Sequence, residues 1–339
     1  MTSTRLIIIA VFAAFALWAG YWFFGQSQQQ TSAANWFESQ QDAGWVAEYD
    51  SLDVQGFPNR FDTVIRDITL ADPKTGWAWS AQSFEILSLS YRPNHVIFVF
   101  PKTHLLRTPH QNIQIANTDL RGSAVFEPGT DYDLNRSSFE GADLVFDAEK
   151  QDPLRISSAQ LATRKSPTDA SAHDIALTLK EVDLGDDVLA LLKGSRGLPS
   201  QVEEIRLRAT ADFSGPWDLP SLSGSGPDLR SLDLDDLSFI WDDLRLRAAG
   251  DLSVDALGYP EGSLDLRAEG WEKMVDIAVA NSWVPRELED SIIAALQFLA
   301  RLKGTAQDLE ISLRFADRTT YLGPIPLGPA PVIWAVQRQ

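Results

Sequence analysis

The chain has 339 residues, of which 44% are apolar and 22% charged, so it can form a packed core of one or two domains. Asp and Glu outnumber Lys and Arg by 47 to 29, and the resulting net charge of −18 argues against nucleic-acid binding, which needs a basic patch. The absence of Cys excludes disulfides, zinc ribbons, thiolate nucleophiles and cysteine-bound iron–sulfur clusters.

The N-terminal segment predicts a membrane-spanning helix. The uncharged run from Leu6 to Phe24 has the length, about 20 residues, that crosses the ~30 Å core of a bilayer. It ends in aromatic side chains that favour the membrane interface: Trp18, Tyr21 and Trp22. Arg5 precedes the run, and the next basic residue is Arg60, so the positive-inside rule places the N-terminus in the cytoplasm and the bulk of the chain across the membrane. We predict a single-pass anchor.

A cleaved signal peptide is the alternative, because Ala14-Phe15-Ala16 has the small-x-small form of a cleavage site. Cleavage there would leave only about ten apolar residues before the site. It would also create a new N-terminus containing Trp18 and Phe23. These features favour a retained anchor.

Period-two alternation dominates the chain after residue 45. From Ile205 to Phe213, apolar residues alternate with polar ones, which predicts a strand with one buried and one solvated face. Comparable strand patterns occur at Phe61 to Leu70, Trp77 to Trp79, Phe84 to Tyr91, His95 to Phe100, Ile113 to Phe126, Phe139 to Phe146, Leu154 to Leu161, Ile175 to Val182, Leu232 to Leu237, Leu244 to Leu246, Leu264 to Leu266 and Ile311 to Phe315. Few helices separate them, so we predict large antiparallel meandering sheets in a mainly β (β-rich α+β) fold.

Two or three amphipathic helices are predicted beyond the anchor region. They cover Trp271 to Trp283 and Arg286 to Leu302, with Val188 to Leu192 as a shorter third. Another short helix is predicted over Ala33 to Trp45, ending at Gly44, with Trp36 and Phe37 near the membrane surface. So few helices cannot cover the apolar faces of a dozen strands. Most of those faces must meet another sheet, curl on themselves or meet a ligand.

Composition predicts three regions: a transmembrane anchor with a short cytoplasmic tip over residues 1–26, a β-rich region over 27–222 and a second β-rich region with two helices over 223–339. The last boundary rests on the Ser-, Gly- and Pro-rich stretch Ser221 to Asp228. Near the C-terminus, Gly323 to Pro331 is too rich in Pro for a central strand and predicts an extended edge or a partner-docking segment.

No residue pattern identifies a catalytic, cofactor-binding or metal-binding site. The histidines His95, His104, His110 and His173 lack HExxH or His-x-His spacing, so ordinary packing is favoured over a metal site. An acidic cluster resembles a calcium loop in composition: Asp233, Asp235, Asp236, Asp242 and Asp243. Ser238 stands where an EF-hand needs Gly, so a solvated strand face is favoured for Asp233 and Asp235.

Motifs for nucleophilic hydrolases and nucleotide-binding enzymes are also missing, and we predict a protein that is not an enzyme. A carboxylate-dependent hydrolase is the enzymatic alternative. The tryptophans are expected to pack in the core, and an aromatic groove for a sugar or lipid is the alternative.

Several segments together resemble a bacterial membrane-anchored family known as domain of unknown function 2125: Gly56-Phe57-Pro58-Asn59-Arg60-Phe61-Asp62, Gly76-Trp77-Ala78-Trp79-Ser80-Ala81, Leu89-Ser90-Tyr91-Arg92-Pro93-Asn94-His95 and Gly323-Pro324-Ile325-Pro326-Leu327-Gly328-Pro329. The resemblance covers nearly the whole chain and implies an envelope protein of a Gram-negative bacterium, with no catalytic or binding residue to transfer. An anchor followed by amphipathic meanders is also similar in style to AsmA-like proteins, which handle lipids between membranes; this is an analogy of fold.

These features lead to one functional expectation with an alternative. We expect an inner-membrane protein whose periplasmic β-rich part binds or shields a lipid or other amphiphile in envelope maintenance. The alternative is an interaction scaffold that docks envelope proteins through its sheet edges or its Pro-rich tail. The residues that would bind the ligand are not identified by the sequence.

Overall fold

The computed structural model describes residues 2–129, 132–149, 151–169, 171–192, 197–218, 221, 226–282, 286–303, 308–323 and 325–334. The chain divides into two compact units: unit 1 comprises Met1–Phe126 and Phe146–Glu149, and unit 2 comprises Glu127–Val145 and Lys150–Gln339. The prediction of a mainly β fold with antiparallel strands and few helices is confirmed. The predicted boundary at residues 222 and 223 lies outside the described residues and within the span of unit 2, and it stays a prediction.

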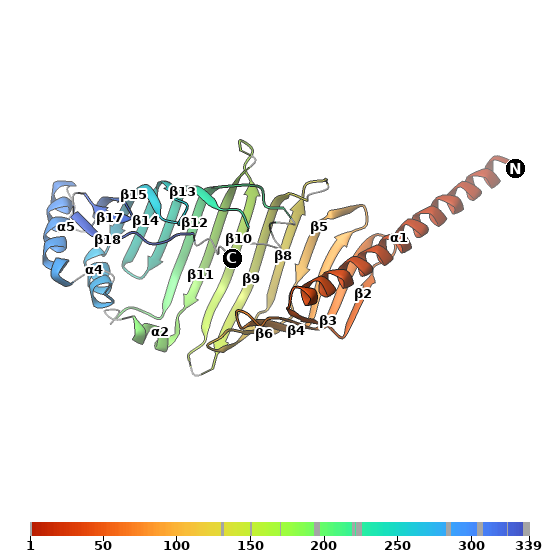
Figure 1. Cartoon of the computed structure of the whole chain (residues 1–339), viewed down its shortest axis with the longest axis horizontal. Coiled ribbons are helices and arrows are strands. Elements are labelled where there is room, and N and C mark those ends of the chain that lie inside the picture. The colour runs from red at the N-terminus through yellow and green to blue at the C-terminus, as the bar shows by residue number, and fades with distance from the viewer. Residues whose placement is uncertain are drawn as a thin grey trace. The chain divides into compact units, whose positions relative to one another are not determined.

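Unit 1 contains one helix and eight strands (Figure 1): α1 (Thr2–Asp42), β1 (Val46–Glu48), β2 (Ser51–Gln55), β3 (Arg60–Asp72), β4 (Trp77–Leu89), β5 (Arg92–Val99), β6 (Thr103–Arg107), β7 (Asn112–Ala116) and β8 (Asp119–Phe126). Strand β3 pairs antiparallel with β1, β2 and β4. Strand β4 pairs with β5 and β6, β5 with β8, and β6 with β7. Residues 113–126 were predicted as one strand, but Asn117 separates β7 from β8 because its side chain donates to the Pro101 carbonyl oxygen, 2.8 Å away.

Helix α1 is one continuous helix of 41 residues, without a Pro to interrupt it. The prediction of a separate short helix over Ala33 to Trp45 is therefore wrong, although its end is placed correctly. Gly44 has φ +92°, and the Trp45 N–H donates to the Gln40 carbonyl oxygen at 3.0 Å, the arrangement in which a left-handed Gly closes a helix.

The C-terminal part of α1 packs on the sheet of unit 1. Its inward stripe repeats with helical spacing and includes Trp22 and Phe37, each 3% exposed. Phe37 packs with residues of β1 to β4 in the main core of unit 1: Ala47, Leu52, Ile65, Ile68 and Ala81. Trp22 packs with Val54 and Phe61 in a second cluster. Phe37, expected at the membrane surface, is thus a core residue.

Unit 2 contains most of β9 (Leu134–Ala148) and the following elements: β10 (Leu154–Lys165), β11 (Ala172–Asp183), α2 (Gly185–Leu191), β12 (Gln201–Phe213), β13 (Leu229–Trp241), β14 (Leu244–Val254), β15 (Pro260–Glu269), α4 (Trp271–Ala280), the 3₁₀ helix η1 (Arg286–Leu288), α5 (Glu289–Lys303), β16 (Asp308–Ala316), β17 (Thr319–Leu322) and β18 (Ile325–Pro329). The three predicted amphipathic helices correspond to α2, α4, and η1 with α5. The predicted end at Trp283 and the adjoining Pro285 lie outside the described residues.

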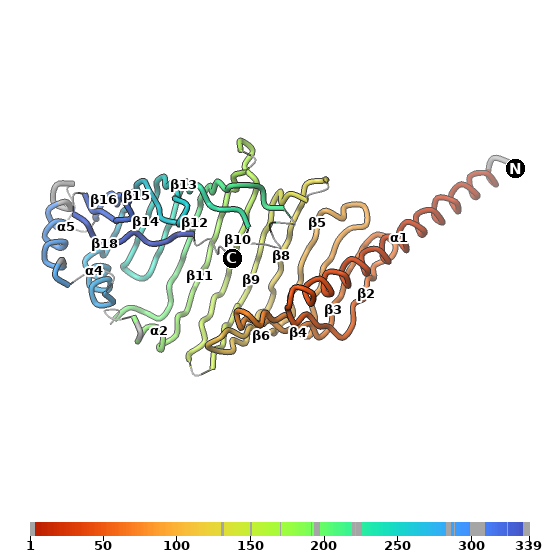
Figure 2. Tube along the Cα trace, viewed as in Figure 1, coloured from red at the N-terminus to blue at the C-terminus, as the bar shows by residue number. Residues whose placement is uncertain are grey.

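The strands of unit 2 form an antiparallel meander. Each strand from β10 to β17 pairs with the next strand in sequence, and the trace in Figure 2 can be followed from one to the next. Gly250 in β14 has φ +146°, and a Cβ there would lie 2.3 Å from the Ser263 carbonyl oxygen, so this close approach of β14 and β15 requires Gly. The Pro-rich segment is extended as predicted and forms β18, which pairs with β17.

Candidate ligand-binding surface

The register of unit 2 aligns aliphatic side chains across six strands. Three adjacent rows run across β11 to β16, and together they define what we call the aliphatic face. The first row is Ile175, Ala209, Leu234, Gly250, Leu264 and Leu313; the second is Leu177, Leu207, Leu237, Ala248, Leu266 and Ile311; the third is Leu179, Ile205, Phe239, Leu246, Ala268 and Leu309.

A bulge in β13 keeps these rows aligned. Leu234 and Leu237 are three residues apart and would point to opposite faces of a regular strand. The register of β13 against β14 shifts between them, so that Leu234 pairs with Gly250 and Leu237 pairs with Ala248. The extra residue is absorbed, and both leucines stay on the aliphatic face.

The opposite face of the same strands carries charged and polar side chains. One row runs Arg206, Ser238, Arg247, Arg267 and Glu310. Arg267 pairs with Glu310 across β15 and β16 at 3.7 Å, and both side chains are about half exposed. This face is suited to water, as the alternation from Ile205 to Phe213 predicts.

Two helices and the C-terminal segment of unit 2 cover parts of the aliphatic face. Helices α4 and α5 supply Trp271, Ile292 and Leu296 to a cluster that also buries Ala268 and Leu309. The C-terminal segment covers the edge of the first row, because Ala330 is 5% exposed and lies in a cluster with Leu252 and Phe315 against which Leu264 and Leu313 pack. Trp334, from the same segment, lies 5.9 Å from the Phe213 ring.

The centre of the aliphatic face is only half buried. Ala209, Leu234 and Ala248 are buried there, but the larger residues around them are partly exposed: Leu207, Leu237, Leu264 and Leu266. On β10, Leu161 pairs with Leu177 and is 38% exposed. A contiguous, partly exposed aliphatic surface of this kind can accept hydrocarbon without a protein partner.

The four histidines do not converge. His95 is on β5 with Nε2 3.1 Å from Ser123 Oγ, and His110 lies in the β6–β7 turn. His104 on β6 is 7% exposed, and burial lowers its pKa. His173 on β11 is 3% exposed; burial and the charge of Lys165 lower its pKa against an opposing effect of Asp174. Among the described residues, no group of three or more His, Asp or Glu side chains could hold a metal ion.

The acidic residues are spread along one hairpin. Asp233 pairs with Asp251 across β13 and β14, and burial together with the charges of Asp251 and Asp235 raises the Asp233 pKa. Asp235 and Asp236 lie at the bulge, while Asp242 and Asp243 form the turn before β14. Asp242 donates its N–H to the Glu203 carboxylate at 3.0 Å. The contact with Glu203 gives Asp242 a structural role, and Asp233 and Asp235 are exposed, as expected for a solvated strand face.

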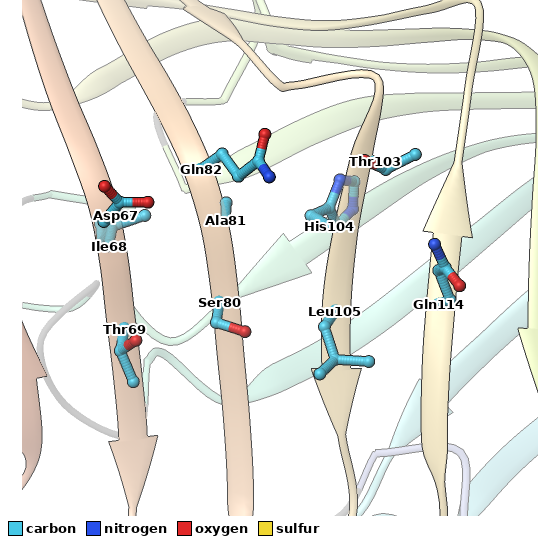
Figure 3. A pocket seen from close by; sticks show the side chains of 10 residues that line it. All are labelled: Asp67, Ile68, Thr69, Ser80, Ala81, Gln82, Thr103, His104, Leu105 and Gln114. Atoms are coloured by element: carbon cyan, nitrogen blue, oxygen red, sulfur yellow. The ribbon is translucent and has the colours of Figure 1, made fainter.

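Unit 1 contains a separate depression of about 450 Å³ across β3, β4, β6 and β7 (Figure 3). Most of its lining residues have polar side chains, among them Asp67, Thr69, Ser80, Gln82 and Gln114. The buried His104 also lines it, and Nδ1 of this side chain has no hydrogen-bond partner. The depression is open to solvent and brings together only two titratable groups, so it does not form a recognisable catalytic arrangement.

The tryptophans pack mainly as core residues. Trp241 and Trp271 are 4% and 3% exposed, and Trp79 contacts Phe84 edge to face at 5.6 Å. Trp77 on the same strand is 49% exposed. The expectation of core packing therefore fits Trp79, Trp241 and Trp271, whereas Trp77 lies at the surface.

Sequence reasoning did not identify the aliphatic face as a site. The alternation of each strand indicates an apolar side, but the continuity of that side depends on the register of six strands and on the bulge in β13. The spacing of Leu232, Leu234 and Leu237 was the one available signal for that bulge.

The comparisons with known proteins identify a family without assigning an activity. Neither the curated proteins nor the solved structures contain a match to this chain. A family model described as an uncharacterized protein conserved in bacteria (DUF2125) matches residues 22–331. The match begins at Trp22, the first buried residue of α1 among those described. The chain belongs to the DUF2125 family of bacterial proteins.

Proposed function

We propose that this protein is anchored in the inner membrane of a Gram-negative bacterium by α1 and binds a lipid or other amphiphile on the aliphatic face of unit 2, without catalysing a reaction. The N-terminus lies in the cytoplasm, and the strands of both units lie in the periplasm. The observation that carries the proposal is the half-buried centre of the aliphatic face.

Helix α1 supports the anchoring part of the proposal. It is long and apolar enough to cross a membrane, a property shared by anchors and signal sequences. Its outer residues are strongly exposed, with Leu6, Phe12 and Leu17 at 66%, 71% and 76%. Exposure of this extent is costly in water and favourable in hydrocarbon. Trp22, which follows the candidate cleavage site, is buried against Val54 and Phe61. Cleavage would therefore leave this aromatic side chain covered by protein.

The two faces of the unit 2 sheet support the binding part. The charged face can remain hydrated, whereas apolar cover on the partly exposed leucines of the opposite face gains, for each, a fraction of the about 1.5 to 3 kcal/mol that burial of a fully exposed leucine provides. An acyl chain lying along Leu177, Leu207 and Leu237 would provide that cover without needing hydrogen bonds.

The experiment compares lipid bound by two full-length variants that differ in one strand position. Leu207→Gln places a polar group on the aliphatic face, and Arg208→Gln alters the next residue, which is exposed on the charged face. Both variants keep α1, so lipid held by the anchor is the same in each. We expect mass spectrometry of organic extracts to show about one lipid fewer per protein for Leu207→Gln.

Equal lipid content in the two folded variants would contradict the proposal. It would favour the alternative, an envelope interaction scaffold, whose test is crosslinking to neighbouring proteins. A fragment beginning near Asn35 is a poorer sample than the full chain, because it lacks Trp22 and the hydrogen bond from Gln26 Nε2 to the Val54 carbonyl oxygen.

A further inference from the structure

The turn between β2 and β3 contacts α1 within the uncharged apolar run of this helix. The Phe15 ring lies 6.2 Å from the Phe57 ring, and Trp18 Nε1 donates to the Pro58 carbonyl oxygen at 2.9 Å. Both helix residues belong to the uncharged run that extends from Leu6 to Phe24. The membrane-spanning and the domain-packing parts of α1 therefore overlap.

The length of α1 makes this overlap significant. The part of α1 that precedes Phe15 and begins at Thr4 is roughly 16 Å long, about half of the ~30 Å hydrocarbon core. A complete span of about 20 residues from Leu6 reaches Gly25. When α1 spans the bilayer, the parts of unit 1 that contact Phe15, Trp18 and Trp22 are consequently carried into the adjoining leaflet.

Two turns of unit 1 are held against this part of α1. The β2–β3 turn, residues 56–59, contributes Phe57, whose ring lies 5.3 Å from Trp22 and 5.8 Å from Phe23. The β4–β5 turn, residues 90 and 91, is held by Tyr21, whose hydroxyl donates to the Ser90 carbonyl oxygen at 2.7 Å. Both turns lie at the same end of the β3–β4 hairpin, where Arg60 pairs with Leu89.

The side chains at the tips of these turns are suited to a membrane interface. Phe57 is 42% exposed although its ring packs on α1, and Tyr91, next to the α1-bound Ser90, is 60% exposed. Aromatic residues at this level prefer the boundary between headgroups and acyl chains. Arg60 and Arg92 flank the turns and can remain among lipid phosphates.

The hydrogen bonds between α1 and the turns suit a non-aqueous setting. Trp22 Nε1 donates to the Arg60 carbonyl oxygen at 2.8 Å, and the bonds from Trp18 and Tyr21 satisfy two further turn carbonyls. Unsatisfied backbone groups are costly in a bilayer, so pairing these carbonyls reduces the cost of placing irregular turns there.

We propose that the β2–β3 and β4–β5 turns insert into the leaflet adjoining unit 1, beside α1, with Phe57 and Tyr91 as the inserted side chains. The inference rests on the proposed membrane-spanning role of α1. Unit 1 is then seated in the membrane surface at a fixed depth instead of being carried above it on a free tether. The partner is the lipid bilayer itself.

The test uses the absence of Cys from the chain, which allows single labelling sites. Full-length Phe57→Cys and Tyr91→Cys are labelled with an environment-sensitive fluorophore in vesicles of phosphatidylethanolamine and phosphatidylglycerol. A fraction of the lipid is brominated on the acyl chain near the glycerol. Phe12→Cys in α1 is the reference for spanning. Trp77→Cys is the matched control, because Trp77 is a 49%-exposed aromatic residue at the far end of the same hairpin, paired with Asp72.

We expect the brominated lipid to quench the fluorescence of labels at positions 57 and 91 at least about threefold more strongly than that of a label at position 77. Quenching at position 12 together with signals at 57 and 91 no stronger than at 77 would overturn the inference and leave the spanning assignment standing. No quenching at position 12 would remove the spanning assignment and this inference with it. Two turn positions are used so that one damaged variant does not decide the result.

Discussion

Unit 1 and unit 2 cover the apolar side of their sheets in different ways. In unit 1, the C-terminal part of α1 lies on β1 to β3, and the residues beneath it are closed off, with Ala47 and Ile68 at 0% and 3% exposed. In unit 2, helices α4 and α5 and the C-terminal segment cover parts of the aliphatic face and leave its central leucines partly exposed. A face closed by the chain's own helix is a core, whereas a half-covered face can still gain free energy from an external apolar partner.

The closed face of unit 1 should depend strongly on Trp22. Trp22→Ala removes a buried ring and the indole donor to the Arg60 carbonyl oxygen, and we expect a loss of about 3 to 5 kcal/mol in the free energy of unfolding. The measurement is urea unfolding in detergent. Phe24→Ala, at a position 66% exposed on the same helix, is the control and should cost less than about 1 kcal/mol. Equal effects would show that α1 does not close unit 1 in solution.

The part of α1 that precedes Phe15 should affect membrane insertion and leave the packing of both sheets unchanged. Ala13→Asp places a charge in the middle of the apolar run, which costs about 2.5 to 3.5 kcal/mol of insertion free energy. We expect the variant to become extractable by carbonate. Thr31→Asp, on an exposed position of the packed part, is the control and should remain membrane-integrated. Full retention of Ala13→Asp would contradict the spanning assignment.

A matched pair of Leu→Ala substitutions compares the two faces directly. Leu52→Ala in unit 1, where Leu52 is 7% exposed, should cost about 2 to 5 kcal/mol in the free energy of unfolding. Leu207→Ala on the aliphatic face should cost about 1 to 2 kcal/mol in delipidated protein, because part of that side chain already contacts solvent. Denaturant titrations of the two variants give the comparison. A cost for Leu207→Ala as large as that for Leu52→Ala would indicate an ordinary closed core in unit 2.

The smallest expected effect is a pH dependence shared by both units. Burial lowers the pKa of His104 in unit 1 and of His173 in unit 2, so each stays neutral when folded at a pH where the unfolded chain binds a proton. Their contribution to stability is complete above an unfolded pKa of about 6.5 and is lost as the pH falls toward the lower folded values.

Urea midpoints measured at about pH 8 and about pH 5.5 should show this loss. The His104→Leu and His173→Leu variants should each reduce it, and Thr163, whose Oγ1 lies 3.0 Å from His173 Nδ1, is the partner affected in unit 2. An unchanged pH dependence in both variants would show that these histidines do not govern it.

The sequence alone was sufficient to predict helices and strands whose side-chain pattern repeats over a few residues. The apolar run from Leu6 to Phe24 predicts the N-terminal helix, and the alternation from Ile205 to Phe213 predicts β12 with its charged and apolar sides. The helical spacing after Arg286 predicts α5. These features are visible because the side-chain period of a strand or helix is set by the backbone and is repeated within a few residues.

Only the tertiary structure decided what covers each apolar side. It joined the anchor and the predicted helix after Ala33 into one α1, buried Phe37 on unit 1, and aligned Leu177, Leu207 and Leu237 into one face of unit 2. It also brought Phe57 and the backbone of Ser90 beside the apolar run. An apolar pattern states that a side chain gains by leaving water, whereas strand register and contacts between distant segments determine whether protein, lipid or solvent meets it.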